Sequence, residues 1–202
     1  MNNDLKSDDG RTARGAQTKN KILQAALDLI GEHGPENFSA GVLAKKVGTA
    51  KSIIFHHFSS VDEIPLKALE MLLTEITRSL GGKNHASAEE YLLGLGESLL
   101  KLVDRNPRLM KSMFFFYQRA LHDPKYQSAL TGIINGFLEE ASSRLKELSE
   151  HKITAQQLRS ISLLLAMTLD GMGYYRLILG DRESFRQSWK LLVQLILGYV
   201  KQ

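Results

Sequence analysis

The chain has 202 residues, enough for one domain or for two small domains that share a core. Apolar residues make up 43% and charged residues 24%, the balance of a soluble globular protein. No cysteine occurs, which excludes disulfides, thiolate metal sites and cysteine nucleophiles. Lysine and arginine outnumber aspartate and glutamate by 26 to 22, a mild surplus that favours an anionic partner.

Neither secretion nor membrane insertion is indicated by the sequence. Residues 1–17 are polar and lack the apolar segment of a signal peptide. The longest apolar stretch, residues 161–169, is interrupted by Ser162 and Thr168 and is too short to cross a bilayer. We therefore expect a cytoplasmic protein with no membrane contact.

Apolar residues recur at three- and four-residue spacing along most of the chain, and no alternating β-branched run occurs. Local signals mark the helix ends: Pro107 and Pro124 each follow a capping residue, Gly180 suits a helix end, and Ser60 with Glu63 matches a capping box. The patterns predict an all-α fold with about nine helices, near residues 18–33, 40–46, 50–57, 61–80, 87–104, 107–121, 124–149, 154–179 and 182–200.

Residues 39–58 are predicted to form two short helices joined by a tight turn. Ser39 is placed to cap the first helix, and Gly48 permits a sharp turn before the second. This arrangement is typical of a helix-turn-helix, whose second helix enters the major groove of DNA.

The second short helix has two different sides at 100° per residue. One side is mostly apolar and is expected to pack on the helix at 18–33; it holds Ala50, Ile53, Ile54, His57 and Phe58. The other side suits a major groove, where short side chains reach base edges and lysine reaches phosphate. It holds Lys51, Ser52, Phe55 and His56.

Positive charge is concentrated in the same part of the chain. Residues 10–58 contain seven basic and three acidic residues, a surplus equal to the net charge of the whole protein, +4. Residues 1–15 are polar and almost without apolar side chains, and we interpret them as a flexible basic arm. Two roles stay open for Arg11 and Arg14 in this arm: contacts in an adjacent minor groove, or a tail that only adds solubility.

Residues 18–64 resemble the DNA-binding domain of the tetracycline-repressor-like (TetR/AcrR) family of bacterial regulators. The spacing matches without gaps at residues 22–30, 34, 39–44, 47–58 and 60–64, and the segment 47–58 reads VGTAKSIIFHHF. The resemblance implies a DNA-binding domain at 16–64 with a recognition helix at 50–57, and an effector-binding and dimerisation domain at 65–202. It also implies a homodimer that binds a palindromic operator, usually as a repressor.

Three positions depart from the family pattern. Phe55 replaces a tyrosine whose hydroxyl commonly meets phosphate, and Val61 replaces a lysine at the start of the next helix. Ala50 replaces a serine, which leaves Thr49 as the cap of the recognition helix. The residues and the resemblance together give these candidate DNA contacts: Arg14, Ser39, Lys45, Lys46, Thr49, Lys51, Ser52, Ile53, Phe55, His56 and His57.

The last two predicted helices carry more apolar residues than one buried stripe requires. Two such helices can form half of a four-helix interface with a second copy, as the family resemblance also implies. The alternative is that both helices are buried within one subunit. The candidate interface residues are Leu177, Trp189, Leu192, Ile196 and Tyr199.

Four consecutive aromatic residues, Phe114 to Tyr117, point around most of a predicted helix and are expected to be packed on several sides. Together with methionines they are suited to an adaptable pocket for a small, mainly apolar effector, although ordinary core packing is the alternative for each. The candidate pocket residues are Met113, Phe114, Tyr117, Arg119, Met167, Asp170 and Tyr174.

The sequence does not favour catalysis. It has no nucleophile elbow, no zinc-binding helix motif and no phosphate-binding glycine loop, so we expect no enzyme activity, cofactor or metal. The prediction is a ligand-responsive, homodimeric transcriptional regulator that binds double-stranded DNA and acts as a repressor. The alternative is a helical small-molecule-binding or interaction protein of the same fold that has lost DNA binding.

Overall fold

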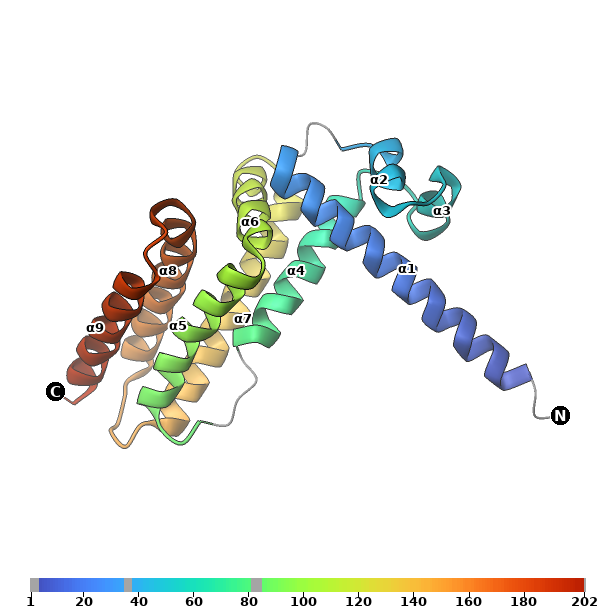
Figure 1. Ribbon diagram of the computed structural model, residues 1–202. Helices are drawn as coiled ribbons and strands as arrows, with labels where there is room; N and C mark the ends of the chain where they lie inside the picture. The colour runs from blue at the N-terminus through green and yellow to red at the C-terminus, as the bar shows by residue number, and fades with distance from the viewer. Residues whose placement is uncertain (1–3, 35–37, 81–84, 202) are drawn as a thin grey trace.

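The computed structural model describes residues 4–34, 38–80 and 85–201. Nine α-helices and no β-strand occur in these ranges, which confirms the all-α prediction (Figure 1). The helices are α1 (Asp4–His33), α2 (Ala40–Val47), α3 (Lys51–His57), α4 (Ile64–Leu80), α5 (Ala88–Arg105), α6 (Pro107–Ala120), α7 (Pro124–Leu148), α8 (Ala155–Leu179) and α9 (Arg182–Val200). None of these described helices has a stretch long and apolar enough to span a bilayer.

Two apolar cores hold the helices together. The first joins α1–α4 to α6 and the start of α7, and its fully buried members include Ile22, Leu27, Leu43, Ile54 and Leu69. The second lies among α5, α8 and α9, and includes Leu92, Leu100, Leu165, Trp189 and Val193. In Figure 1, α1 runs away from the helical body towards the N-terminus, with α2 and α3 beside it. The small helices are therefore anchored to the body through the first core.

Helix α6 approaches α1 closely. The Ser112 hydroxyl, which is buried, lies 2.8 Å from the backbone oxygen of Leu27 on α1 and 3.0 Å from that of Arg108, and shares its proton between them. A Cβ atom on Gly31 would lie 2.9 Å from both the Arg108 oxygen and the Ser112 Oγ. The absence of a side chain at position 31 is thus what permits this distance between the two helices.

Helix α9 is seated on α5 by a similar contact. The indole Nε1 of Trp189 donates a 2.8 Å hydrogen bond to the backbone oxygen of Leu92. The indole ring lies directly against Gly96, where a Cβ atom would collide with it. Burial of this large ring, with its one polar atom satisfied, makes Trp189 the anchor of α9 on its own subunit.

Two helix starts differ from the sequence prediction. Helix α1 begins at Asp4 instead of near residue 18, so residues 4–15 of the predicted flexible arm have a helical backbone; residues 1–3 lie outside the described ranges. No proline interrupts this stretch, so the backbone hydrogen bonds of α1 continue through it. Helix α4 begins at Ile64, and the predicted capping box at Ser60 is wrong. The Glu63 carboxylate instead accepts hydrogen bonds from the backbone N–H (2.7 Å) and hydroxyl (2.9 Å) of Ser59.

The contact between Gly96 and Trp189 leads to a stability prediction. We expect Gly96→Ala to lower the free energy of unfolding by about 1–3 kcal/mol, because the added methyl group must displace a rigid, buried indole ring. Chemical denaturation followed by circular dichroism measures the change. Gly132→Ala on α7 is the matched control: a Cβ there meets nothing within 4 Å, and alanine favours helix by about 1 kcal/mol. Equal effects of the two substitutions would contradict the assigned role of Gly96.

Candidate nucleic-acid interface and Asp170 cluster

Backbone groups and one glycine hold the turn between α2 and α3. The Ser39 hydroxyl caps α2 by accepting a 3.2 Å hydrogen bond from the backbone N–H of Val42. Gly48 ends α2 with φ of 73°, a left-handed conformation that strains any residue with a side chain. The N–H of Thr49 donates to the oxygen of Ala44 at 2.9 Å, so α3 begins close to the end of α2.

The start of α3 differs from the prediction in one detail. Ala50 is the N-cap residue of α3, and no side chain makes a capping hydrogen bond there. The expectation that Thr49 caps this helix is wrong, because Thr49 lies one residue too early and its own N–H completes the end of α2. The first turn of α3 therefore depends on packing for its stability, because it has no side-chain cap.

Helix α3 is attached by a narrow apolar side. Ile54 and the following Phe58 are fully buried in the first core, whereas Lys51, Ser52 and His56 are exposed. The side chain of Phe55 is 52% exposed although it is entirely apolar. Ile53, which we placed on the packed side, is 38% exposed, so the surface that α3 presents to solvent is wider than predicted.

His57 borders this exposed surface and is half-buried. Burial lowers the pKa of His57, and the neighbouring charges of His56 and Lys19 lower it further. The imidazole is therefore neutral near pH 7 and offers hydrogen bonds rather than a full positive charge.

Lys51 is supported by α2. A Cβ atom on Gly41 would lie 3.0 Å from the Cε atom and 3.4 Å from the Nζ atom of Lys51. The aliphatic part of the Lys51 side chain thus lies against the backbone of α2. This contact fixes the direction in which the exposed side chain leaves the start of α3.

The remaining basic candidates have different surroundings. Lys46 is held by an ion pair in which its Nζ lies 2.8 Å from an oxygen of Glu32, and Arg108 of α6 lies 3.2 Å from the other oxygen of Glu32. The Lys46 hydrogen bond is the main reason that the pKa of Glu32 is lowered. Lys45 and Arg14 are exposed on α2 and α1. Lys46 thus belongs to an ion-pair network that joins α2 to α1 and α6.

Comparison with known proteins agrees with this geometry. Residues 22–66 match the family described as bacterial regulatory proteins, tetR family. The chain is 35% identical over 69 residues to an uncharacterized HTH-type transcriptional regulator, YvdT of Bacillus subtilis, a match that covers 34% of this chain and only 36% of YvdT. It is 26% identical over 156 residues to the HTH-type transcriptional regulator PksA of B. subtilis, covering 71% of this chain and 74% of PksA.

The fold comparison extends over the rest of the chain. A transcriptional regulator from Rhodococcus sp., RHA1_ro04179, superposes with a TM-score of 0.78 at 21% identity, covering 91% of this chain and 98% of that one. Residues 22–66 therefore form a DNA-binding domain of the tetR family of bacterial regulatory proteins. Its helix-turn-helix, α2 and α3, is accordingly the DNA-binding element of a family of transcriptional regulators.

Four of the predicted pocket residues come together between α6 and α8, and we call them the Asp170 cluster: Phe114, Tyr117, Asp170 and Tyr174. The Tyr117 hydroxyl donates a 2.7 Å hydrogen bond to the Asp170 carboxylate. The ring of Tyr174 lies edge-on to Phe114 at 6.0 Å and to Tyr117 at 6.4 Å between centroids. Burial raises the pKa of Asp170, and the Tyr117 hydrogen bond lowers it by less.

The other three predicted pocket residues lie elsewhere. Met113 is buried in the first core, and Met167 is exposed. Arg119 forms an ion pair with Asp123, with 3.2 Å between nitrogen and oxygen, and its guanidinium lies 5.7 Å from the ring centroid of Tyr126. We therefore exclude these three from the Asp170 cluster.

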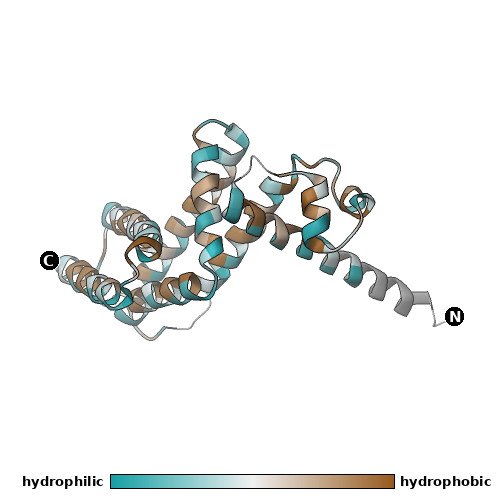
Figure 2. Ribbon diagram, turned by 45° about the horizontal axis from the view of Figure 1, so that its top comes forward, coloured by the Kyte–Doolittle hydropathy of each residue, from teal (hydrophilic) through white to brown (hydrophobic). Residues whose placement is uncertain are grey.

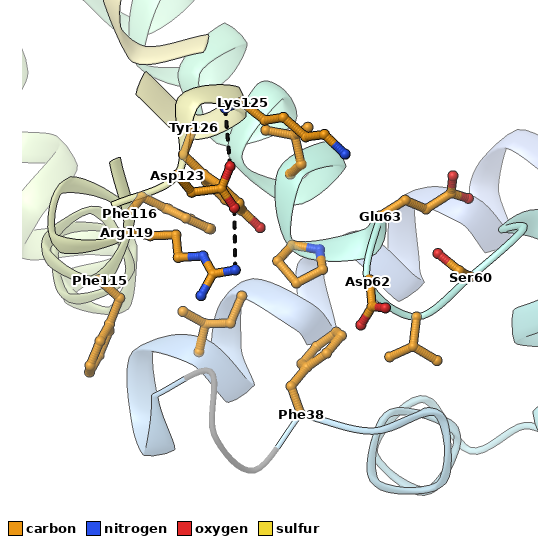
Figure 3. Close-up of a pocket in the computed structure, with 14 residues that line it drawn as sticks. Phe38, Ser60, Asp62, Glu63, Phe115, Phe116, Arg119, Asp123, Lys125 and Tyr126 are labelled. Carbon is orange, nitrogen blue, oxygen red and sulfur yellow. Dashed lines mark hydrogen bonds and ion pairs between the residues drawn. The ribbon is translucent and has the colours of Figure 1, made fainter. Parts of the chain in front are cut away.

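Arg119 instead lines a cavity that the sequence prediction missed. This cavity of about 660 Å³ lies where α1 and the loop before α4 meet the end of α6 and the start of α7 (Figure 3). Phe38, Phe116 and Tyr126 contribute aromatic walls, and Asp62 carries a carboxylate there. The contributing residues are far apart in sequence, so no local pattern indicated the cavity.

The predicted dimer residues divide into two groups. Trp189 and Ile196 are buried within the subunit, and placing them in an interface between copies was wrong, because α9 uses this side to pack on α5. Leu177 and Leu192 are half-buried, and Tyr199 is exposed. Apolar residues recur along the helices at the C-terminal end of the molecule, brown in Figure 2. Several that we did not predict are exposed on α8 and α9: Leu164, Tyr175, Ile178, Leu191 and Leu195.

The raised pKa of Asp170 generates a pH prediction. A carboxyl whose pKa is higher in the folded than in the unfolded state stabilises the fold at low pH, and this contribution is lost as pH rises through the folded pKa. We expect the melting temperatures of wild type and Asp170→Asn to run close together at low pH and to diverge towards pH 7, with the variant more stable. Calorimetry between pH 4 and 7 measures the difference. Glu139→Gln, which changes an exposed carboxylate on α7, is the control, and parallel curves for Asp170→Asn would refute the prediction.

Proposed function

We propose that this protein is a homodimeric, ligand-responsive transcriptional regulator that binds a palindromic operator. The observation that carries the proposal is the exposure of one side of α3, from Lys51 to His56, while Ile54 and Phe58 anchor the opposite side. A helix held in this way fits into the major groove, which is about 12 Å wide. Lys51, Ser52 and His56 supply charge and short hydrogen-bonding groups to phosphates and base edges.

Two copies are needed for a palindromic site. The exposed apolar residues of α8 and α9 support pairing through these two helices in a four-helix arrangement. A two-fold axis between the copies would place the two α3 helices in successive major grooves, about 34–36 Å apart. The exposed side chains assigned to this interface are Leu164, Tyr175, Ile178, Leu191, Leu195 and Tyr199.

We propose that the Asp170 cluster is part of the effector site. The support is the position of α6, which contributes Phe114 and Tyr117 to the cluster and, earlier on the same helix, Arg108 and Ser112 to the contact with α1. An effector that shifts α6 would therefore act on the helix that carries the DNA-binding element. The effector changes operator affinity to the extent that it binds more tightly to one arrangement of the two α3 helices in the dimer. The family resemblance supports repression as the sense of regulation.

Lys51 provides the test of DNA binding. We expect Lys51→Ala to weaken binding to duplex DNA and to reduce the slope of log affinity against log salt by about 0.9 for each subunit bound, because one phosphate contact is lost. Fluorescence anisotropy with a labelled duplex over a salt series gives the slope. Lys152→Ala, which removes an exposed lysine between α7 and α8, is the control and should leave the slope unchanged. Wild-type protein without salt-dependent binding would favour the helical binding protein that has lost DNA recognition.

Leu195 provides the test of the dimer. Its side chain is 63% exposed on α9, and Leu195→Glu places a charge in the proposed apolar interface. We expect the variant to sediment as a monomer at micromolar concentration while the wild type sediments as a dimer. Leu121→Glu is the matched control, because Leu121 is 78% exposed but lies just after α6. A dimer that survives Leu195→Glu and dissociates with Leu121→Glu would place the interface elsewhere.

A further inference from the structure

The Asp170 cluster contains a carboxylate that forms no ion pair with any of the described residues. Among the described residues, the only hydrogen bond to the Asp170 carboxylate comes from Tyr117, a neutral donor. The arginine nearest along α8, Arg176, is paired with Asp104 at 2.9 Å instead. A carboxylate that is largely withdrawn from water is normally paired with a cation.

A second polar group in the cluster lacks a hydrogen-bond partner altogether. The hydroxyl of Tyr174 is buried and has no hydrogen-bond partner within the described part of the chain. Its ring lies edge-on to both the Phe114 and the Tyr117 rings. Buried polar groups without partners are rare in folded proteins, and here one lies in the same cluster as a carboxylate that only a neutral donor meets.

We infer that the Asp170 cluster binds an organic cation, an ammonium group with apolar substituents. Aromatic faces attract such a cation through the negative charge of their π systems, and the carboxylate neutralises it. An anion would be repelled by Asp170, and a neutral ligand would leave the carboxylate without a counter-charge. A hard metal ion requires several oxygen ligands, and no group of three candidate ligands is found among the described residues.

The position of Phe114 supplies a route of entry. Its ring is 51% exposed, whereas Tyr117 and Tyr174 are largely covered, so Phe114 forms the open side of the cluster. A cation that enters past this ring contacts α6 and α8 at once. The inference rests on the proposed function only in taking the bound cation to be the effector, and it refines the expected effector from mainly apolar to apolar with a positive charge.

Two probes of equal shape test the charge. (3-Hydroxyphenyl)trimethylammonium carries a quaternary nitrogen, and 3-tert-butylphenol has carbon in its place. We expect isothermal titration calorimetry on the full-length protein to give at least about tenfold tighter binding of the cation. In Asp170→Asn this preference should disappear, whereas Glu139→Gln should retain it. Equal binding of both probes, no binding of the cation up to millimolar concentration, or an unchanged preference in Asp170→Asn would overturn the inference.

Phe114→Leu is a second variant that does not disturb the core, because the ring is half-exposed. Leucine keeps the apolar contact but removes one π face, so the cation should lose several-fold in affinity and the neutral probe much less. This result decides the matter if Asp170→Asn does not fold. The titrations contain no DNA, so a failure of DNA binding and a failure of cation binding are observed separately.

Discussion

The close contact between α1 and α6 is the constraint on which the rest of the structure depends. Helix α1 carries the helix-turn-helix on one side and meets the helical body on the other. The shared proton of Ser112 and the missing side chain of Gly31 bring the two helix backbones together without an intervening layer of side chains. Displacements of α6 are therefore transferred to α1 directly, since close-packed interiors deform little.

The same contact connects the Asp170 cluster to α1. Tyr117 and Ser112 are little more than one turn apart on α6, so the aromatic residues and the α1 contact belong to one rigid element. If the proposed cation binds between α6 and α8, it will change the packing at one end of this element. The DNA-binding helices would then respond through the first core, in which α3 is held by Ile54 and Phe58.

Much of the fold could be predicted because the decisive signals are local. Prolines 107 and 124, Gly48 and Gly180 mark helix ends within one residue of where the structure has them, and the helix-turn-helix follows from the spacing of Val47, Gly48 and the apolar residues around it. Exposure of Lys51 and burial of Ile54 likewise follow from helical periodicity alone.

The wrong predictions concern residues whose burial is determined by contacts with segments distant in the sequence. Trp189 and Ile196 lie on an apolar helix with two apolar sides, and only the position of α5 determines which side is buried. Met167 shares the helical phase of Tyr174, but its turn of α8 is left uncovered. Similarly, the cavity at Arg119 is assembled from segments about 90 residues apart, which no periodicity can indicate.

The ion-pair chain from Arg108 through Glu32 to Lys46 has a consequence for the thermodynamics of complex formation. Lys46 can meet a phosphate only by exchanging one anionic partner for another, so it releases fewer condensed counterions from DNA than its charge suggests. The ionic-strength dependence of the complex would then underestimate the number of lysines and arginines that touch the duplex. Glu32 would then keep its contacts with Arg108 of α6 and with the neighbouring His33. Its attraction to Arg108 would strengthen, so that DNA binding would be coupled to the packing of α6.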